Sequence, residues 1–199
     1  GDKNFIFFEN EAWTYSQINS SANMLANKLI NDGINHGDRV VLFMENRPDY
    51  VISILALNKI GAIGVLINTS LTGQPLIHCI NSSDSKKCIF GAELSVPLSE
   101  VLDKINIKNK LDFLWVKDTD DYECPYWASD LKFQLDATNI NNLAITNKVT
   151  AKDIAFYIFT SGTTGVPKAA LFPNVKIIAA AINITKGGYR MNHEDCMYN

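Results

Sequence analysis

Short apolar runs of strand length alternate along this chain with segments of helical periodicity. Residues 39–44 (RVVLFM) are the longest such run in the first half, and the same pattern predicts strands at residues 64–67, 88–90 and 113–116. Strands that are apolar at successive positions are buried on both faces, which is typical of parallel sheets. The sequence therefore predicts an α/β fold, a layered parallel sheet with helices on both faces.

The first helix has the clearest boundaries. Thr14 and Gln17 have the spacing of a capping box, in which each side chain accepts a hydrogen bond from the other residue's backbone N–H. Apolar side chains then recur at helical spacing as far as Gly33, a typical helix stop. Further helices are predicted from an Asn46 cap to about residue 60, and at residues 75–80, 98–105 and 177–184.

The composition argues against several classes of function. The formal net charge is −3 and no Lys/Arg-rich tract occurs, so nucleic acid is not expected as a partner. The apolar stretch at residues 50–67 is interrupted by Lys59 and two glycines, which favours a buried helix and strand over a membrane span. No signal peptide is recognised. We expect a cytoplasmic protein, with attachment to the membrane surface left open.

No arrangement of side chains predicts a protein-bound metal. The four cysteines lack CxxC spacing and are expected to be reduced, mostly buried thiols. The three histidines, His78 among them, are isolated in sequence and are interpreted as loop or surface residues. The acidic cluster around Asp118 is interpreted as a solvated loop within a surface connection at residues 117–136.

The most informative segment follows a predicted strand at residues 154–159. This strand (IAFYIF) runs directly into TSGTTGVPK at positions 160–168. Gly162 and Gly165 allow the backbone to approach a ligand closely, with successive N–H groups directed at one anion. Lys168 adds a positive charge at the end of the loop. The remaining donors are the hydroxyls of Thr160, Ser161, Thr163 and Thr164.

These residue types in this order suit a phosphate-binding loop. Composition alone is equally compatible with an ordinary flexible turn between two strands. The spacing excludes both the GxxxxGK[ST] phosphate loop and the GxGxxG dinucleotide fingerprint.

The longer string YIFTSGTTGVPKAA, at positions 157–170, resembles the phosphate-binding signature of the adenylate-forming (AMP-binding) superfamily. Within that superfamily the chain is most similar to the fatty acid transport protein and very-long-chain acyl-CoA synthetase group. This narrower resemblance rests on WTY at 13–15, GDRV at 37–40, ENRPDY at 45–50, KIGA at 59–62, LINTSL at 66–71 and GAEL at 91–94.

The resemblance implies that residues 1–199 are part of the large N-terminal domain of an adenylate-forming enzyme, without the rest of that domain or the C-terminal domain. It implies a fatty acid–CoA ligase as the parent protein, using ATP, Mg²⁺ and coenzyme A, and an inactive isolated fragment. By position, residues 160–165 would cradle the triphosphate. Lys168 would contact its β- and γ-phosphates as the catalytic residue.

One residue departs from the family pattern, and two other functions stay open. Asn174 stands where relatives usually carry a histidine, and is predicted either to replace it or to cap the following helix. The alternatives are an adenylating enzyme with an acceptor other than coenzyme A, and a non-catalytic ATP-binding protein of lipid uptake. Neither acyl chain length nor oligomeric state is predicted.

Overall fold

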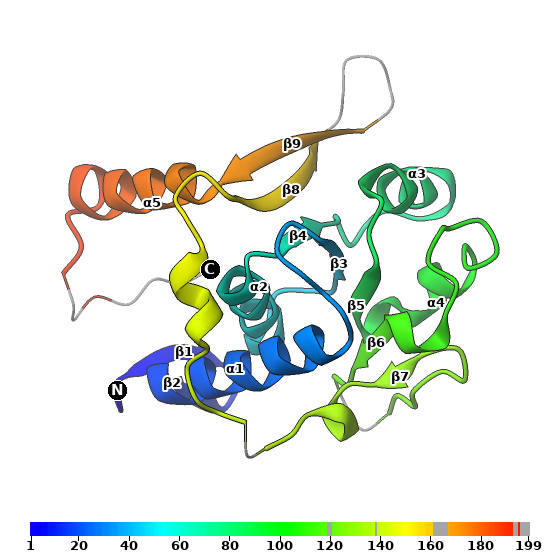
Figure 1. The fold of residues 1–199 in the computed structure, drawn as a ribbon, viewed down its shortest axis with the longest axis horizontal. Helices are drawn as coiled ribbons and strands as arrows, with labels where there is room; N and C mark the ends of the chain where they lie inside the picture. Colours follow the sequence, from blue (N-terminus) through cyan, green and yellow to red (C-terminus); the bar gives the residue numbers. More distant parts are fainter. Residues whose placement is uncertain (119–120, 138, 161–166, 193–194, 196–199) are drawn as a thin grey trace.

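A computed structural model describes residues 1–118, 121–137, 139–160, 167–192 and 195. Its centre is a seven-stranded sheet with the strand order β7-β6-β5-β3-β4-β8-β9 (Figure 1). Neighbouring strands are parallel except for β8 and β9, which are antiparallel. The strands are β3 (Arg39–Phe43), β4 (Ile63–Leu66), β5 (Lys87–Gly91), β6 (Phe113–Val116), β7 (Ser129–Asp130), β8 (Ile154–Thr160) and β9 (Lys168–Pro173).

The remaining elements surround this sheet. An antiparallel hairpin of β1 (Asn4–Phe8) and β2 (Glu11–Thr14) precedes the first helix. The α-helices are α1 (Tyr15–Asn31), α2 (Pro48–Ile60), α3 (Gly73–Ser83), α4 (Ser95–Ser99) and α5 (Asn174–Ile182). The short helices are η1 (Ala92–Leu94), η2 (Lys110–Asp112), η3 (Lys132–Gln134), η4 (Ala144–Lys148) and the π-helical η5 (Asn183–Gly188).

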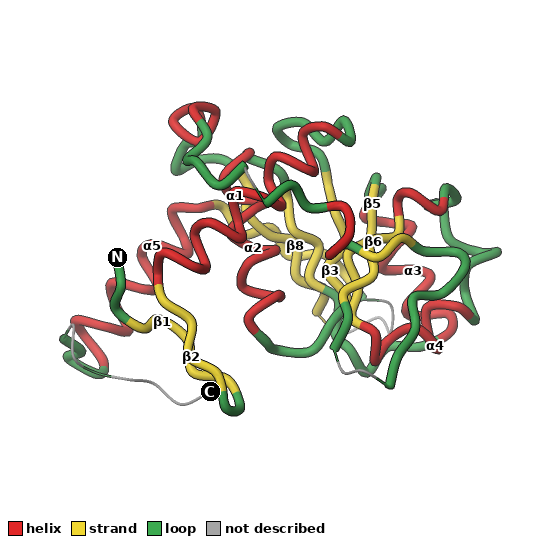
Figure 2. Tube along the Cα trace, turned by 90° about the horizontal axis from the view of Figure 1, so that it is seen from below, coloured by secondary structure: helices red, strands yellow, loops and turns green. Residues whose placement is uncertain are grey.

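Helices cover both faces of the sheet, as predicted. Successive residues of a strand point to opposite faces, so β3 contributes to two separate cores. Val40 and Leu42 pack with the apolar faces of α1 and α2. Val41 and Phe43 pack with α3 and α4. Figure 2 shows the two helix pairs on opposite sides of the strands.

Local signals placed the first helix correctly. Thr14 Oγ1 accepts a hydrogen bond from the Gln17 backbone N–H at 3.2 Å, and Gln17 Oε1 accepts one from the Thr14 N–H at 2.7 Å. The capping box is therefore confirmed. Gly33, with φ of +85°, lies just beyond the helix end.

The helix predicted at residues 98–105 is wrong. The regular helix α4 is only five residues long and ends at Ser99. Tight turns follow, in which the Lys104 N–H donates to the Val101 carbonyl. Val101 and Ile105 are buried nevertheless. Successive turns thus bury apolar side chains at the same spacing as a helix would. The sequence pattern does not distinguish the two.

The end of the described chain departs from a purely parallel arrangement. β9 returns antiparallel to β8, and α5 leads away from it (Figure 1). None of the residues of α5 is buried. Regular α-helix also ends earlier than predicted, at Ile182, where η5 takes over. In the described part of the chain, no helix combines the length and apolar character needed to cross a bilayer.

Candidate phosphate-binding site

The predicted loop leaves the sheet at the edge where the parallel strands end. β8 is parallel to β4, with Leu66 opposite Ile158. The carboxyl ends of β3, β4, β5, β6 and β8 therefore lie at one edge. In open α/β sheets, ligands bind in crevices outside this edge. The loop thus begins beside the segment that follows β4.

Thr160, the last residue of β8, and Lys168, the first residue of β9, flank this loop. They are directly opposite each other in the antiparallel β8–β9 pair, and both are exposed. Cα atoms of such cross-strand partners lie about 4.5–5.5 Å apart. The Thr160 hydroxyl and the Lys168 ammonium therefore belong to neighbouring residues at the same edge of the sheet. The other predicted members of the loop, Ser161, Gly162, Thr163, Thr164 and Gly165, lie outside the described residues.

A histidine from α3 contacts the same loop. His78 Nε2 lies 2.9 Å from the carbonyl oxygen of Pro167, the residue before Lys168. A carbonyl only accepts hydrogen bonds, so the imidazole proton is on Nε2. His78 was interpreted as a loop or surface residue, but it is half-buried on a helix. No sequence signal joins these residues, which are 89 positions apart.

A crevice opens beside the start of the loop. α2 follows β3 on one face of the sheet and α3 follows β4 on the other, so the connections that leave these two parallel neighbours lead to opposite faces. The carboxyl ends of β3 and β4 border a cavity of about 490 Å³. Burial raises the pKa of the Tyr50 phenol. The lining residues are Met44, Glu45, Asn46, Tyr50, Ile67, Asn68 and Thr69.

A buried arginine at this edge of the sheet forms ion pairs with acidic side chains from two other segments of the chain. Only 5% of the Arg47 side chain is exposed, and its Nη1 lies 3.0 Å from Glu93 and 3.2 Å from Asp118. Glu93 also accepts a hydrogen bond from the Glu45 N–H at 2.8 Å. Asp118 is exposed, as predicted for a solvated loop, and the sequence pattern missed only its ion pair with Arg47. Its carboxylate helps to neutralise Arg47.

Gly91 is required by the same arrangement. A Cβ at this position would lie 2.2 Å from a carboxylate oxygen of Glu93 and 2.4 Å from Nη2 of Arg47. Arg47 also occupies the N-cap position of α2, where Asn46 was predicted. Its extended backbone and the following Pro48 start the helix without a side-chain cap.

Asn174 does not lie at the loop. It is the first residue of α5, beyond the end of β9 that pairs with Ile154, whereas Lys168 begins β9 at the opposite end. Pro173 is the N-cap, so the capping role predicted for Asn174 is wrong. Its side-chain amide instead donates to the Thr150 carbonyl at 3.0 Å. This contact joins α5 to the segment before β8.

Comparison with known proteins agrees with this geometry. The model of the family described as "AMP-binding enzyme" matches residues 1–199. The chain belongs to this family. Among relatives, long-chain fatty acid transport protein 6 of Mus musculus is 30% identical over 186 residues, which is 92% of this chain and 29% of that protein.

A second sequence relative and one solved structure extend this comparison. The medium/long-chain fatty-acid–CoA ligase FadD6 of Mycobacterium tuberculosis is 32% identical over 201 residues, covering all of this chain and 31% of that protein. A long-chain fatty-acid–CoA ligase of Archaeoglobus fulgidus has the same fold, with a TM-score of 0.73 at 20% identity over 99% of this chain and 37% of that structure. The chain spans less than a third of the length of these two sequence relatives.

Proposed function

We propose that the protein of which these residues form a part activates a long- or very-long-chain fatty acid with ATP, first to acyl-AMP and then to acyl-CoA. The observation that carries this proposal is the pairing of Thr160 and Lys168 at the mouth of the signature loop. The names of the sequence relatives support the fatty-acid substrate.

The chemistry of the first step explains why such a loop would be needed. A carboxylate oxygen of the fatty acid attacks the α-phosphorus, and the bond from that phosphorus to the bridging oxygen breaks to release pyrophosphate. Negative charge grows on the leaving group, and donors held in place stabilise it without reorganising water. Lys168 is exposed and makes no ion pair with another described residue. Its ammonium is therefore available to the β- and γ-phosphates.

The residues of the loop suit phosphate better than a metal ion. Among the described residues, no cluster of three or more His, Cys, Asp or Glu side chains could hold a metal. We propose that Mg²⁺ arrives with ATP. In the second step, the thiol of coenzyme A would attack the acyl carbonyl and displace AMP.

The chain corresponds to only part of the length of its sequence relatives. It covers 29% and 31% of the two sequence relatives described above. We propose that residues 1–199 form part of a larger N-terminal domain and lack synthetase activity in isolation. Attachment of the complete protein to a membrane surface is compatible with this proposal.

The test is fatty-acid-dependent exchange between ATP and pyrophosphate, with the complete protein and carboxylic acids of graded length. Lys168→Ala should lower exchange by roughly a hundred-fold or more. Lys152→Ala is the matched control, because this exposed lysine precedes β8 at the opposite edge of the sheet. Exchange that is unchanged in Lys168→Ala would refute the role of Lys168.

Other outcomes separate the alternatives. ATP binding without exchange for any acid would favour a non-catalytic lipid-uptake protein. Exchange without formation of an acyl-CoA thioester would favour an acceptor other than coenzyme A.

A further inference from the structure

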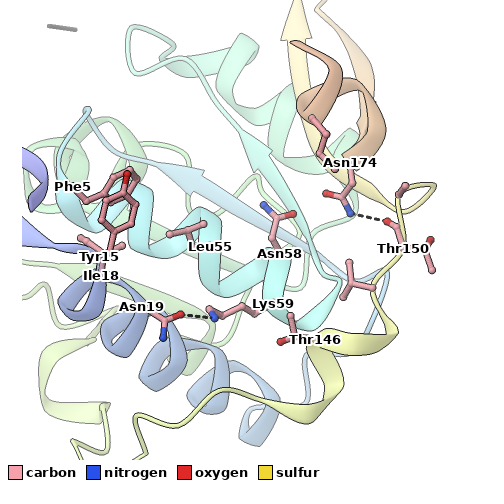
Figure 3. A pocket seen from close by; sticks show the side chains of 13 residues that line it. Phe5, Tyr15, Ile18, Asn19, Leu55, Asn58, Lys59, Thr146, Thr150 and Asn174 are labelled. Atoms are coloured by element: carbon pink, nitrogen blue, oxygen red, sulfur yellow. Dashed lines mark hydrogen bonds between the residues drawn. The ribbon is translucent and has the colours of Figure 1, made fainter. Parts of the chain in front are cut away.

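A second cavity lies away from the loop, on the α1–α2 side of the sheet. Its volume is about 590 Å³, within the range of roughly 300–1,000 Å³ for small-molecule sites. Thr150 and Ala151, which line it, precede β8, so the cavity is near the opposite edge of the sheet from Thr160. Helices α1, α2 and α5, the β1 strand and the segment of Thr146 and Val149 contribute the rest of the wall (Figure 3).

Most of the lining is apolar. Phe5 and Tyr15 stack with ring centroids 4.5 Å apart, and Leu55 and Ile18 continue the apolar surface along α2 and α1 (Figure 3). Ile178, on α5, also lines the cavity. Such a surface favours an aliphatic or aromatic group over water.

One lysine interrupts this apolar surface. Lys59 is half-buried, and its ammonium donates a hydrogen bond to Asn19 Oδ1 at 2.8 Å (Figure 3). Burial lowers its pKa. It takes part in none of the ion pairs found among the described residues. An ammonium has three donors, so two are left for a ligand.

The polar groups around Lys59 do not supply the missing negative charge. The Asn19 amide nitrogen is itself bonded to Asn142, at 3.0 Å. Thr146 lines the same cavity, and its hydroxyl is buried without a hydrogen-bond partner in the described part of the chain. A partly desolvated cation beside an unsatisfied hydroxyl is complementary to an anionic oxygen ligand.

We propose that this cavity binds an amphipathic carboxylate, a fatty acid, with the carboxylate on Lys59 and the hydrocarbon chain along the apolar wall. An alcohol of the same length would lack the charge that Lys59 pairs with. An amphipathic cation would be repelled. This site does not depend on the proposed ATP-dependent activity, because it uses none of the residues of the phosphate-binding loop.

The test is photolabelling of the complete protein with dodecanoate that carries an aliphatic diazirine, followed by peptide mapping. We expect cross-links on peptides that contain Leu55 or Ile178. Lys59→Met keeps the apolar stem but removes the charge, and should raise the concentration for half-maximal labelling at least ten-fold. Lys59→Arg should restore labelling. Ala151→Trp should block it by filling the cavity from an exposed position.

Lys148→Met is the matched control, since Lys148 is exposed on the same short helix as Thr146 but does not line the cavity. Its labelling should equal that of the wild type. Unchanged cavity labelling in Lys59→Met, equal labelling by the diazirine analogue of dodecanol, or no cross-links at these peptides would overturn the proposal. Cross-links at an acyl-activation site elsewhere map to other peptides, so a failure here is distinct from a failure of the proposed ligase activity.

Discussion

His78 and Pro167 are joined by a hydrogen bond of 2.9 Å between the imidazole Nε2 and the backbone carbonyl. The bond connects α3 to the residue directly before Lys168. It holds one end of the loop against a helix that packs on the central sheet. We therefore expect His78 to position Lys168 rather than to contact phosphate itself.

Substitution of His78 tests this positioning role. Glutamine can place its amide nitrogen near the position of Nε2, whereas the shorter asparagine side chain cannot reach it. His78→Asn should lower the rate of ATP–pyrophosphate exchange roughly ten-fold, because small displacements of catalytic groups are costly. His78→Gln should retain most of the rate.

The control for these variants is Ser82→Ala on the same helix. The Ser82 hydroxyl donates to the His78 carbonyl and does not reach the loop. Thermal unfolding should be similar in all three variants. Equal exchange rates for the Asn and Gln variants would show that the hydrogen bond does not position the loop.

Removal of the buried Arg47 guanidinium should destabilise the fold strongly. Arg47→Met leaves the carboxylates of Glu93 and Asp118 without their cation. Breaking a buried pair in this way costs about 3–5 kcal/mol of unfolding free energy. Urea denaturation measures the loss. Arg39→Met is the control, because the side chain of its partner Asp84 is 85% exposed and such pairs contribute about 1 kcal/mol or less. A similar loss in both variants would contradict this account.

Acid should weaken the contact between Asp153 and the residues around it. The pKa of Asp153 is lowered by a hydrogen bond from the Thr150 backbone N–H and then by one from His36. A carboxyl whose pKa is lower in the folded state stabilises the fold above its unfolded pKa, and this contribution is lost as pH falls through the folded value.

Asp153→Asn should therefore show a flatter dependence of unfolding free energy on pH than the wild type below about pH 4, where unfolded aspartate titrates. Chemical denaturation at a series of acidic pH values measures this difference. Parallel curves for the two proteins would argue against the contribution of Asp153.

The buried thiols should resist alkylation. Burial raises the pKa of Cys79 to about 11, and raises the pKa of Cys88 further. Only the thiolate reacts readily, so both should remain unmodified by iodoacetamide at pH 8 while the protein is folded. Both should react once urea unfolds it. Mass spectrometry identifies the modified residues, and rapid modification of Cys88 in the native protein would contradict its burial.

Reasoning from the sequence succeeded where the interactions are local. The strand Arg39–Phe43 and the helix α2 lie within a residue or two of their predicted bounds, because continuous apolar runs and a proline in the first helical turn act over short distances. The predicted burial of thiols is confirmed for Cys79 and Cys88. The same reasoning failed for residues 98–105, where turns bury the same side chains that a helix would.

The sequence by itself determined the alternation of strands and helices, the capping box of α1 and the position of the signature loop after β8. These features depend on residues a few positions apart, whose spacing carries the information. Only the tertiary structure decided that His78 contacts Pro167, that Arg47 joins Glu93 and Asp118, and that Lys59 borders an apolar cavity. Each of these contacts joins segments brought together by the order of strands in the sheet, and no local periodicity encodes that order.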